Sequence, residues 1–244
     1  MDLENKVALV TGGARRIGRA ISLALATAGA RVAVHYGGSA LAAEETVSEI
    51  EAKGGSAFSF QADLKNEEAA NSVIPAVLKE FERVDILINN AAVFKPGALS
   101  ETTSEHWDLQ FQINLKTPFL LSQAFAAQMD LEHPGKIINI TDWRILRPND
   151  EFFAYTLTKS GIEAMTRSLA VTLAPQVQVN CLALGAILPP AGASADYQEQ
   201  LISKIPARRM GSTRDVIQTL MFLLQDGDFI TGETILIDGG RHLV

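Results

Sequence analysis

The chain alternates short segments rich in β-branched residues with longer segments of helical period, and this alternation recurs along its whole length. The apolar run at 7–11 predicts a strand, and the amphipathic stretch at 15–28 predicts the helix that follows it. The later predicted strands are 31–36, 57–61, 84–88, 136–141, 177–182 and 234–238. The predicted helices between them are 40–52, 67–82, a long stretch through 107–129, 152–174, 196–205 and 215–225.

Several predicted strands are apolar on both faces, as in Val84-Asp85-Ile86-Leu87-Ile88. Strands buried on both sides belong to a parallel sheet with helices on each face, so we expect a doubly wound, seven-stranded α/β fold. A length of 244 residues without a repeat or a linker-like break predicts a single domain. Segment 185–195 holds two Pro, two Gly and four Ala and predicts a mobile loop, within a substrate lid at about 185–205.

Composition narrows the class of partner. Twenty-one Lys and Arg against 28 Asp and Glu give a net charge of −7, the wrong sign for binding nucleic acid or an anionic membrane. The single cysteine, Cys181, excludes an internal disulfide and is expected to be buried and inert. The four His share no metal-ligand spacing, so no metal site is predicted. Without a signal peptide or an apolar run near ~18 residues, the chain is expected to be cytoplasmic.

The first predicted strand ends in a glycine-rich turn, Thr11-Gly12-Gly13-Ala14-Arg15-Arg16-Ile17-Gly18. Ligands of an open parallel sheet bind beyond the carboxyl ends of its strands, where helices begin. Gly12 and Gly13 permit a tight turn that lets a pyrophosphate approach the backbone, and Gly18 lets the helix pack on the strand. Such a turn alone is equally typical of simple turn geometry, but its place after the first strand favours dinucleotide binding.

Tyr155 and Lys159 stand four residues apart near the start of a predicted helix, so both project from one face. A neighbouring ammonium stabilises a phenolate and lowers the pKa of the phenol, which lets the pair pass a proton. Taken alone, a Tyr and a Lys at this spacing are more typical of a solvated helix face.

Three features in order resemble the short-chain dehydrogenase/reductase family: the glycine-rich turn, Asn89-Asn90-Ala91-Ala92 and Tyr155-Thr156-Leu157-Thr158-Lys159. The resemblance covers essentially the whole chain and implies one Rossmann-type domain over 1–244, which in this family commonly forms a homotetramer. Asp63-Leu64 resembles the pair that contacts adenine. Asn114 resembles the Asn that completes the catalytic group through a water relay.

Departures from the common family pattern are informative. Arg16 stands where Gly is usual, Asp142 stands where a catalytic Ser is usual, and Phe94 lies four residues past Asn90. Together with His35-Tyr36 after the second strand, these residues resemble the pteridine reductase branch. There the Asp and Tyr flank the pterin, the Phe stacks on it, and the Arg reaches toward pterin and phosphate. Ala92 and Gly38 depart from this branch, which has Ser and Arg at those positions.

The resemblance implies an NADPH-dependent reductase of a pterin-like small molecule, dihydrofolate included, in which Tyr155 donates the proton. Asp142 would orient Tyr155 and, if protonated, serve as a second acid. The residues implied for catalysis are Asp142, Tyr155, Lys159 and Asn114. Those implied for the substrate are Phe94, Arg16, Asp142 and Tyr155. Those implied for the coenzyme are Gly12, Arg15, Arg16, Ile17, His35, Ser39, Asp63, Leu64, Asn90, Ala91, Tyr155, Lys159, Gly185 and Ile187.

Alternatives remain open from the residues alone. The first alternative is a carbonyl reductase that acts on a ketone, a sugar or a 3-ketoacyl thioester. The second is a non-catalytic NADP-binding sensor. An ionised Asp142 would repel a developing carbonyl oxyanion, which argues against the first. Phe94 is alternatively a packing residue of the core, and Asp142 is alternatively a cap for the following loop. For Trp143, Phe152 and Phe153 we expect packing in the core or lid.

Overall fold

A computed structural model describes residues 1–190 and 192–244. Its seven strands form one sheet in the order β3-β2-β1-β4-β5-β6-β7, and every neighbouring pair is parallel. The strands are β1 (Val7–Val10), β2 (Arg31–Tyr36), β3 (Ser56–Gln61), β4 (Ile86–Asn89), β5 (Gly135–Asp142), β6 (Val177–Leu184) and β7 (Thr234–Ile237). The chain order reverses between β1 and β4, which confirms the predicted doubly wound sheet.

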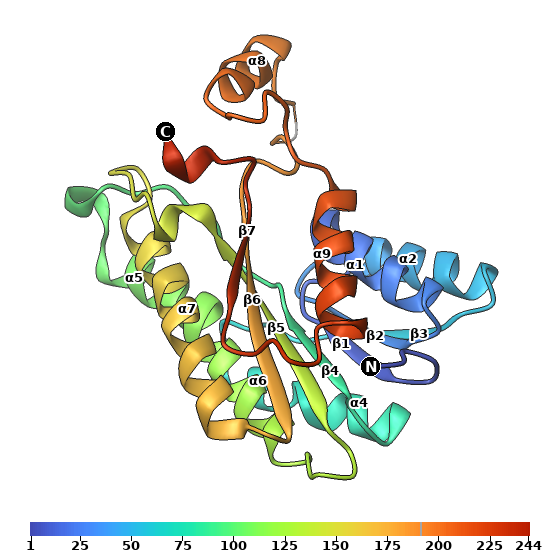
Figure 1. Ribbon diagram of the computed structural model, residues 1–244. Helices are drawn as coiled ribbons and strands as arrows, with labels where there is room; N and C mark the ends of the chain where they lie inside the picture. Colours follow the sequence, from blue (N-terminus) through green and yellow to red (C-terminus); the bar gives the residue numbers. More distant parts are fainter. Residues whose placement is uncertain (191) are drawn as a thin grey trace.

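Helices cover both faces of the sheet (Figure 1). One layer contains α1 (Arg16–Thr27), α2 (Ala40–Ala52) and α9 (Thr213–Gln225), whose apolar side chains share a core with one face of the strands. The other layer contains α3 (Glu67–Asn71), α4 (Val73–Phe81), α5 (Ser104–Phe111), α6 (Thr117–Ala126) and α7 (Phe153–Leu173). The remaining helix, α8 (Ala195–Ser203), projects above the sheet beside the C-terminus.

The predicted helix at 67–82 is two helices. Asn66 caps α3 by accepting hydrogen bonds from the backbone of Glu68 and Ala69, and α4 starts at Val73. Pro75 explains the interruption, because it lacks the N–H that would bond to the carbonyl of Asn71 in a continuous helix. Two shorter helices therefore replace the expected long one.

The predicted long helix through 107–129 is also interrupted. A π-helical turn, η2 (Gln112–Lys116), separates α5 from α6. Pro118 stands in the first turn of α6, where a missing N–H is tolerated. A π-turn of this kind holds one extra residue in the helix, and here Asn114 lies at its centre.

Cys181 is fully buried in β6, as expected. Within the part of the chain that the structure describes, no helix has the length and apolar character to cross a bilayer. The predicted loop at 185–195 includes Ala191, which lies outside the described residues. Helix α8 follows this loop, so the expected lid contains a short helix.

Candidate active site

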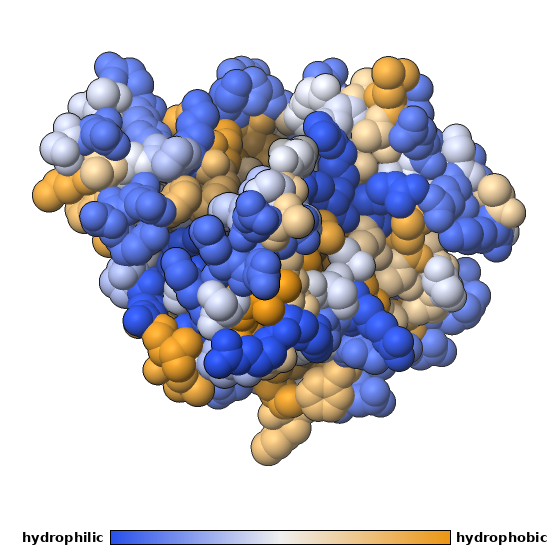
Figure 2. Space-filling model, turned by 90° about the horizontal axis from the view of Figure 1, so that it is seen from above, coloured by the Kyte–Doolittle hydropathy of each residue, from blue (hydrophilic) through white to orange (hydrophobic). Residues whose placement is uncertain are grey.

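A cleft of about 1310 Å³ opens at the carboxyl ends of the strands. Figure 2 views the molecule from above and shows a largely hydrophilic surface with hydrophobic residues between the polar ones. Ser39 and Asn114 are the two predicted site residues that are not part of the cleft lining. Those that line it are Gly12, Arg15, Arg16, Ile17, His35, Asp63, Leu64, Asn90, Ala91, Phe94, Asp142, Tyr155, Lys159, Gly185 and Ile187.

The glycine-rich turn forms one end of the cleft. Gly12 has φ +61°, a conformation that favours glycine, and a Cβ added at Gly18 would collide with the carbonyl oxygen of Gly12. The N-cap residue of α1, Arg15, provides no side-chain cap. The first N–H groups of α1 therefore stay available to a ligand, and the turn has the shape and polarity that a pyrophosphate needs.

Two polar side chains hold this turn, the buried His35 and the half-buried Asn90. His35 Nδ1 accepts a hydrogen bond from the Gly12 N–H at 3.1 Å, and its Nε2 lies 3.0 Å from the Ala62 carbonyl. Burial lowers the pKa of His35, which fits a neutral ring with one donor and one acceptor. Asn90 Nδ2 donates to the carbonyls of Thr11 and Gly12 at 2.8 and 3.2 Å. His35 and Asn90 thus fix the backbone of the turn.

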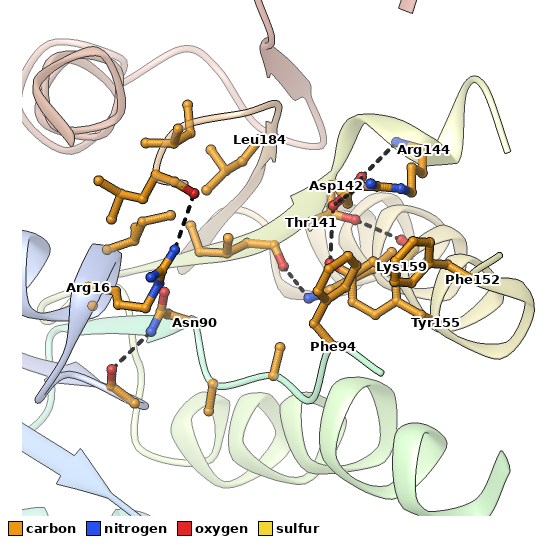
Figure 3. A pocket seen from close by; sticks show the side chains of 18 of the residues that line it. Arg16, Asn90, Phe94, Thr141, Asp142, Arg144, Phe152, Tyr155, Lys159 and Leu184 are labelled. Atoms are coloured by element: carbon orange, nitrogen blue, oxygen red, sulfur yellow. Dashed lines mark hydrogen bonds and ion pairs between the residues drawn. The ribbon is translucent and has the colours of Figure 1, made fainter. Parts of the chain in front are cut away.

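Arg16 spans the cleft (Figure 3). It has φ +51°, rare for a residue with a side chain, and its guanidinium donates to the carbonyls of Leu188 and Pro189 at 3.2 and 3.1 Å. The glycine-rich turn is therefore joined directly to the segment that leads to α8.

The region after β2 contains no carboxylate in the sequence His35-Tyr36-Gly37-Gly38-Ser39. Gly37 and Gly38 face open space and line the cleft, together with Asp63 and Leu64 after β3. An acidic residue at the end of β2 would repel a 2′-phosphate, so the absence of one in 35–39 suits a phosphorylated adenosine ribose. Ser39 lies one residue before α2 and outside the lining.

Asp142 and Tyr155 meet at the other end of the cleft. The Tyr155 hydroxyl donates to Asp142 Oδ2 at 3.2 Å. Arg144 donates to the same carboxylate three times, through its backbone N–H at 2.9 Å and through Nη1 to each oxygen at 3.0 Å. The backbone bond caps the short helix η3 (Trp143–Ile145), so Asp142 is a loop cap as well as the partner of Tyr155.

The electrostatics of Tyr155 differ from the sequence expectation. Burial raises the pKa of the Tyr155 hydroxyl well above its ordinary value, and the negative charge of Asp142 raises it further, while Arg144 opposes both. The ammonium of Lys159 lies 5.7 Å from the centre of the Tyr155 ring and donates to the Ile140 carbonyl at 2.9 Å. The expectation that Lys159 lowers the pKa of Tyr155 was wrong for this structure, because burial is the largest cause of the shift and Asp142 adds to it.

The pKa of Lys159 is also shifted. Its side chain is fully enclosed, and burial lowers its pKa to about 8, with Asp142 and Cys181 opposing the change. The same burial raises the pKa of the Cys181 thiol to about 12. The cysteine therefore stays protonated and inert, as predicted from its place in a strand.

Asn114 does not face the cleft. Its Oδ1 accepts from the Val93 N–H at 2.8 Å, and its Nδ2 donates to the Val93 carbonyl at 2.9 Å and to Thr158 at 3.3 Å. These bonds connect the π-turn to the segment after β4 and to α7. The side chain positions the strand end that leads to Phe94.

An aromatic group faces the cleft (Figure 3). Phe94 is 52% exposed, which rules out a role in the core. Its ring stacks on Phe152 with centroids 4.4 Å apart and planes 8° apart, and Tyr155 meets it edge-on at 4.7 Å. Phe152 and Trp143 also line the cleft. Trp143 is buried as predicted, whereas the prediction of core or lid packing was wrong for Phe152. Phe153 is not part of the lining.

Comparison with known proteins identifies the family. A family model described as enoyl-(acyl carrier protein) reductase matches residues 12–242. A 3-oxoacyl-[acyl-carrier-protein] reductase of Staphylococcus epidermidis is 37% identical over 243 residues, covering 98% of this chain and all of that protein. The chain belongs to the short-chain dehydrogenase/reductase family. It is therefore an oxidoreductase, in agreement with the sequence resemblance.

Solved structures of similar proteins contain a nicotinamide coenzyme. FolM alternative dihydrofolate reductase 1 from Brucella canis, complexed with NADP, superposes with a TM-score of 0.92 at 34% identity, covering 100% of this chain and 97% of that one. A blue fluorescent protein from a metagenomic library, in complex with NADPH, gives 0.91 at 33% identity and 99% of each chain. The short-chain dehydrogenase/reductase fold thus extends over the full chain.

Sequence reasoning missed two arginines of the site. Arg144 pairs with Asp142, and Arg241 lies in the short helix η4 (Arg241–Leu243) and also lines the cleft. The signal for Arg144 was available, because a carboxylate at the end of a buried strand needs a nearby cation or several hydrogen bonds. No comparable signal marks Arg241, which reaches the cleft only through the path of the chain after β7.

Proposed function

We propose that the protein is an NADPH-dependent reductase of a pterin or dihydropterin ring, dihydrofolate included. The observation that carries this proposal is the Asp142 carboxylate beside the Tyr155 hydroxyl. Reduction of a carbonyl builds negative charge on the oxygen, which a carboxylate at this position disfavours. A C=N nitrogen is basic enough to take its proton from Tyr155 before or as the hydride reaches the carbon, so little negative charge develops on it and the same carboxylate opposes the reaction less.

The aromatic group supports the same substrate class. One face of Phe94 is covered by Phe152, and the pair borders the cleft next to Tyr155. A flat heteroaromatic ring gains about 0.5–1.5 kcal/mol from stacking on such a ring, beyond the burial of its surface. The chain is also similar to a Brucella canis protein named alternative dihydrofolate reductase, and dihydrofolate belongs to this substrate class.

In the proposed reaction, NADPH supplies the hydride when it is bound over the glycine-rich turn. Gly12, Gly18 and the open start of α1 fit its pyrophosphate, and Gly37 and Gly38 leave room for the 2′-phosphate. Tyr155 donates the proton to the ring nitrogen. Asp142 orients the hydroxyl as an acceptor and does not serve as a second acid, because four hydrogen bonds already fill its two oxygens.

Substrate comparison tests the proposal. Purified protein with NADPH is offered dihydrobiopterin, dihydromonapterin, dihydrofolate, a quinone and a ketone, and the loss of NADPH absorbance is followed. We expect turnover of at least one pterin or folate with kcat/KM well above that of the ketone. Phe94→Leu keeps most of the apolar volume, so we expect it to raise KM for the dihydropterin and leave the ketone unchanged. Robust ketone reduction without turnover or binding of any pterin would refute the proposal.

A second candidate is the reduction of a 3-oxoacyl thioester. It is favoured by the relatives named 3-oxoacyl-[acyl-carrier-protein] reductase, at 37% identity in Staphylococcus epidermidis and 36% in Synechocystis. Asp142→Ser separates the two candidates, since a hydroxyl donates to a carbonyl oxygen where a carboxylate repels it. The pterin proposal expects this variant to lose pterin turnover and gain carbonyl turnover. If the wild-type protein already reduces 3-oxoacyl thioesters well, the second candidate replaces the first.

A further inference from the structure

Two arginines that the proposed reaction does not use meet at one tryptophan in the cleft. The Arg144 guanidinium lies 5.3 Å from the centre of the Trp143 ring, and that of Arg241 lies 4.6 Å from it. Trp143 is 9% exposed, and all three residues line the cleft. The short helices η3 and η4 bring them together from positions almost a hundred residues apart in the sequence.

Two carboxylates lie near the two guanidiniums, and both are already engaged by other groups. Asp142 is shared between Arg144 and Tyr155, and Asp238, the acidic group near Arg241, already accepts from His242 and from the Gly240 and His242 N–H groups. Burial and the charge of Arg144 lower the pKa of Arg241, while Tyr197, Asp142 and Asp238 oppose this through their charges. Asp142 is paired with Arg144 and Asp238 contacts His242, whereas Arg241 makes no ion pair within residues 1–190 and 192–244, so its guanidinium is left to bind an anion.

Donors are also left over. Arg144 uses Nη1 for both oxygens of Asp142, and its Nε is buried with no hydrogen-bond partner within residues 1–190 and 192–244. The Nε is enclosed and out of a ligand's reach, but the Nη2 of Arg144 makes no hydrogen bond within the described residues either, and this is the donor left for a ligand in the cleft. Tyr197, Gln200 and Lys204 of the lid segment line the same cleft and add polar groups and a third cation.

We propose that Arg144 and Arg241 form a subsite for an anionic substituent of the substrate, a carboxylate or a phosphate carried beyond the ring that reacts. This rests on the proposed function for the identity of the ring, but the charge requirement follows from the two guanidiniums alone. The substrate is then a pterin with an acidic tail, such as the glutamyl group of a folate or a phosphorylated side chain. A neutral dihydroxypropyl tail leaves Arg241 without a partner.

Matched substrates and variants test the subsite. Wild type, Arg241→Gln and the control Arg147→Gln are assayed with dihydrobiopterin, dihydrofolate and dihydroneopterin monophosphate. Arg147 is exposed on the same loop and does not line the cleft. We expect Arg241→Gln to raise KM for the acidic substrate by about tenfold without changing its kcat or the kinetics of dihydrobiopterin. The control variant keeps wild-type values, and whichever acidic substrate is affected more identifies the tail as carboxylate or phosphate.

Salt provides an independent readout. KM for the acidic substrate should rise with ionic strength in the wild type and lose most of that dependence in Arg241→Gln. Equal effects on neutral and acidic substrates, or no effect on either, would overturn the subsite. If no pterin is turned over, the proposed function fails by itself, and a 3-oxoacyl phosphopantetheine and its N-acetylcysteamine analogue then serve as the anionic and neutral pair. The subsite stands or falls on whether Arg241→Gln weakens only the phosphorylated one.

Discussion

Replacing Lys159 by Met should make the coenzyme-free protein more stable at neutral pH. The Lys159 side chain is buried, and its ammonium makes one hydrogen bond, to the Ile140 carbonyl. Its pKa falls from 10.5 to about 8, which corresponds to a cost of about 3 kcal/mol for holding the charged form in the folded state. Loss of the hydrogen bond to Ile140 costs the Met variant about 1 kcal/mol, so we expect its free energy of unfolding to rise by about 2 kcal/mol.

The sign of the pH dependence follows from the same pKa. The unfolded chain binds the Lys159 proton more tightly than the folded protein does, so the penalty is complete below pH 8 and disappears as the pH rises to 10.5. Between pH 7 and 9.5 the unfolding free energy should rise by about 2 kcal/mol from this residue. The raised pKa of Cys181 acts in the opposite direction above pH 9, because its stabilising effect is lost as the pH climbs toward 12.

Urea unfolding of the Cys181→Ala background therefore isolates the effect of Lys159. The free energy of unfolding is measured at pH 7 and 9.5 with Lys or Met at position 159. We expect the rise with pH in the Lys protein and a nearly flat profile, starting higher, in the Met protein. A Met variant that is less stable at pH 7, or that keeps the same rise with pH, would refute the argument that the buried ammonium carries this cost.

Three further outcomes are expected. Tyr155→Phe should lower turnover by roughly 10²–10⁴-fold and leave NADPH binding intact by fluorescence titration, and retention of more than about a tenth of the turnover would assign the proton to another group. NADPH should exceed NADH in kcat/KM by about tenfold or more, because the end of β2 has no carboxylate, and equal values would contradict this. Arg16→Gly should be more stable than Arg16→Ala by about 1 kcal/mol in urea unfolding, since both lose the bonds to the lid segment but only glycine adopts φ +51° without strain. Equal stabilities of the two variants would show that the backbone at Arg16 is not strained.

The element order and the sheet could be predicted because hydrophobic period and β-branched content report burial directly. The interruption at Pro75 could also have been predicted, because a proline inside a helical pattern removes a backbone hydrogen bond, but the hydrophobic period alone does not show it. The π-turn at Asn114 could not, because one extra residue shifts the period too little to be seen.

The residues of the site whose role depends on their own side chain could be predicted from the sequence. Properties that depend on several side chains lying close together could not. Tyr155 and Asp142 were identified, but the effect of their proximity was not, because it depends on the 3.2 Å between two oxygens and on their burial. Arg144 and Phe152 lie near them in the sequence, yet only the fold shows that both face the same cleft.

Arg16 reaches the lid segment through backbone carbonyls alone, those of Leu188 and Pro189. Every amino acid offers the same carbonyl, so this attachment does not depend on which side chains the lid carries. Side chains such as Tyr197 and Lys204 can therefore change without loss of the hydrogen bonds from Arg16. Randomising the side chains of this segment should therefore leave its attachment to the glycine-rich turn in place, provided that the number of residues between Gly185 and α8 is kept.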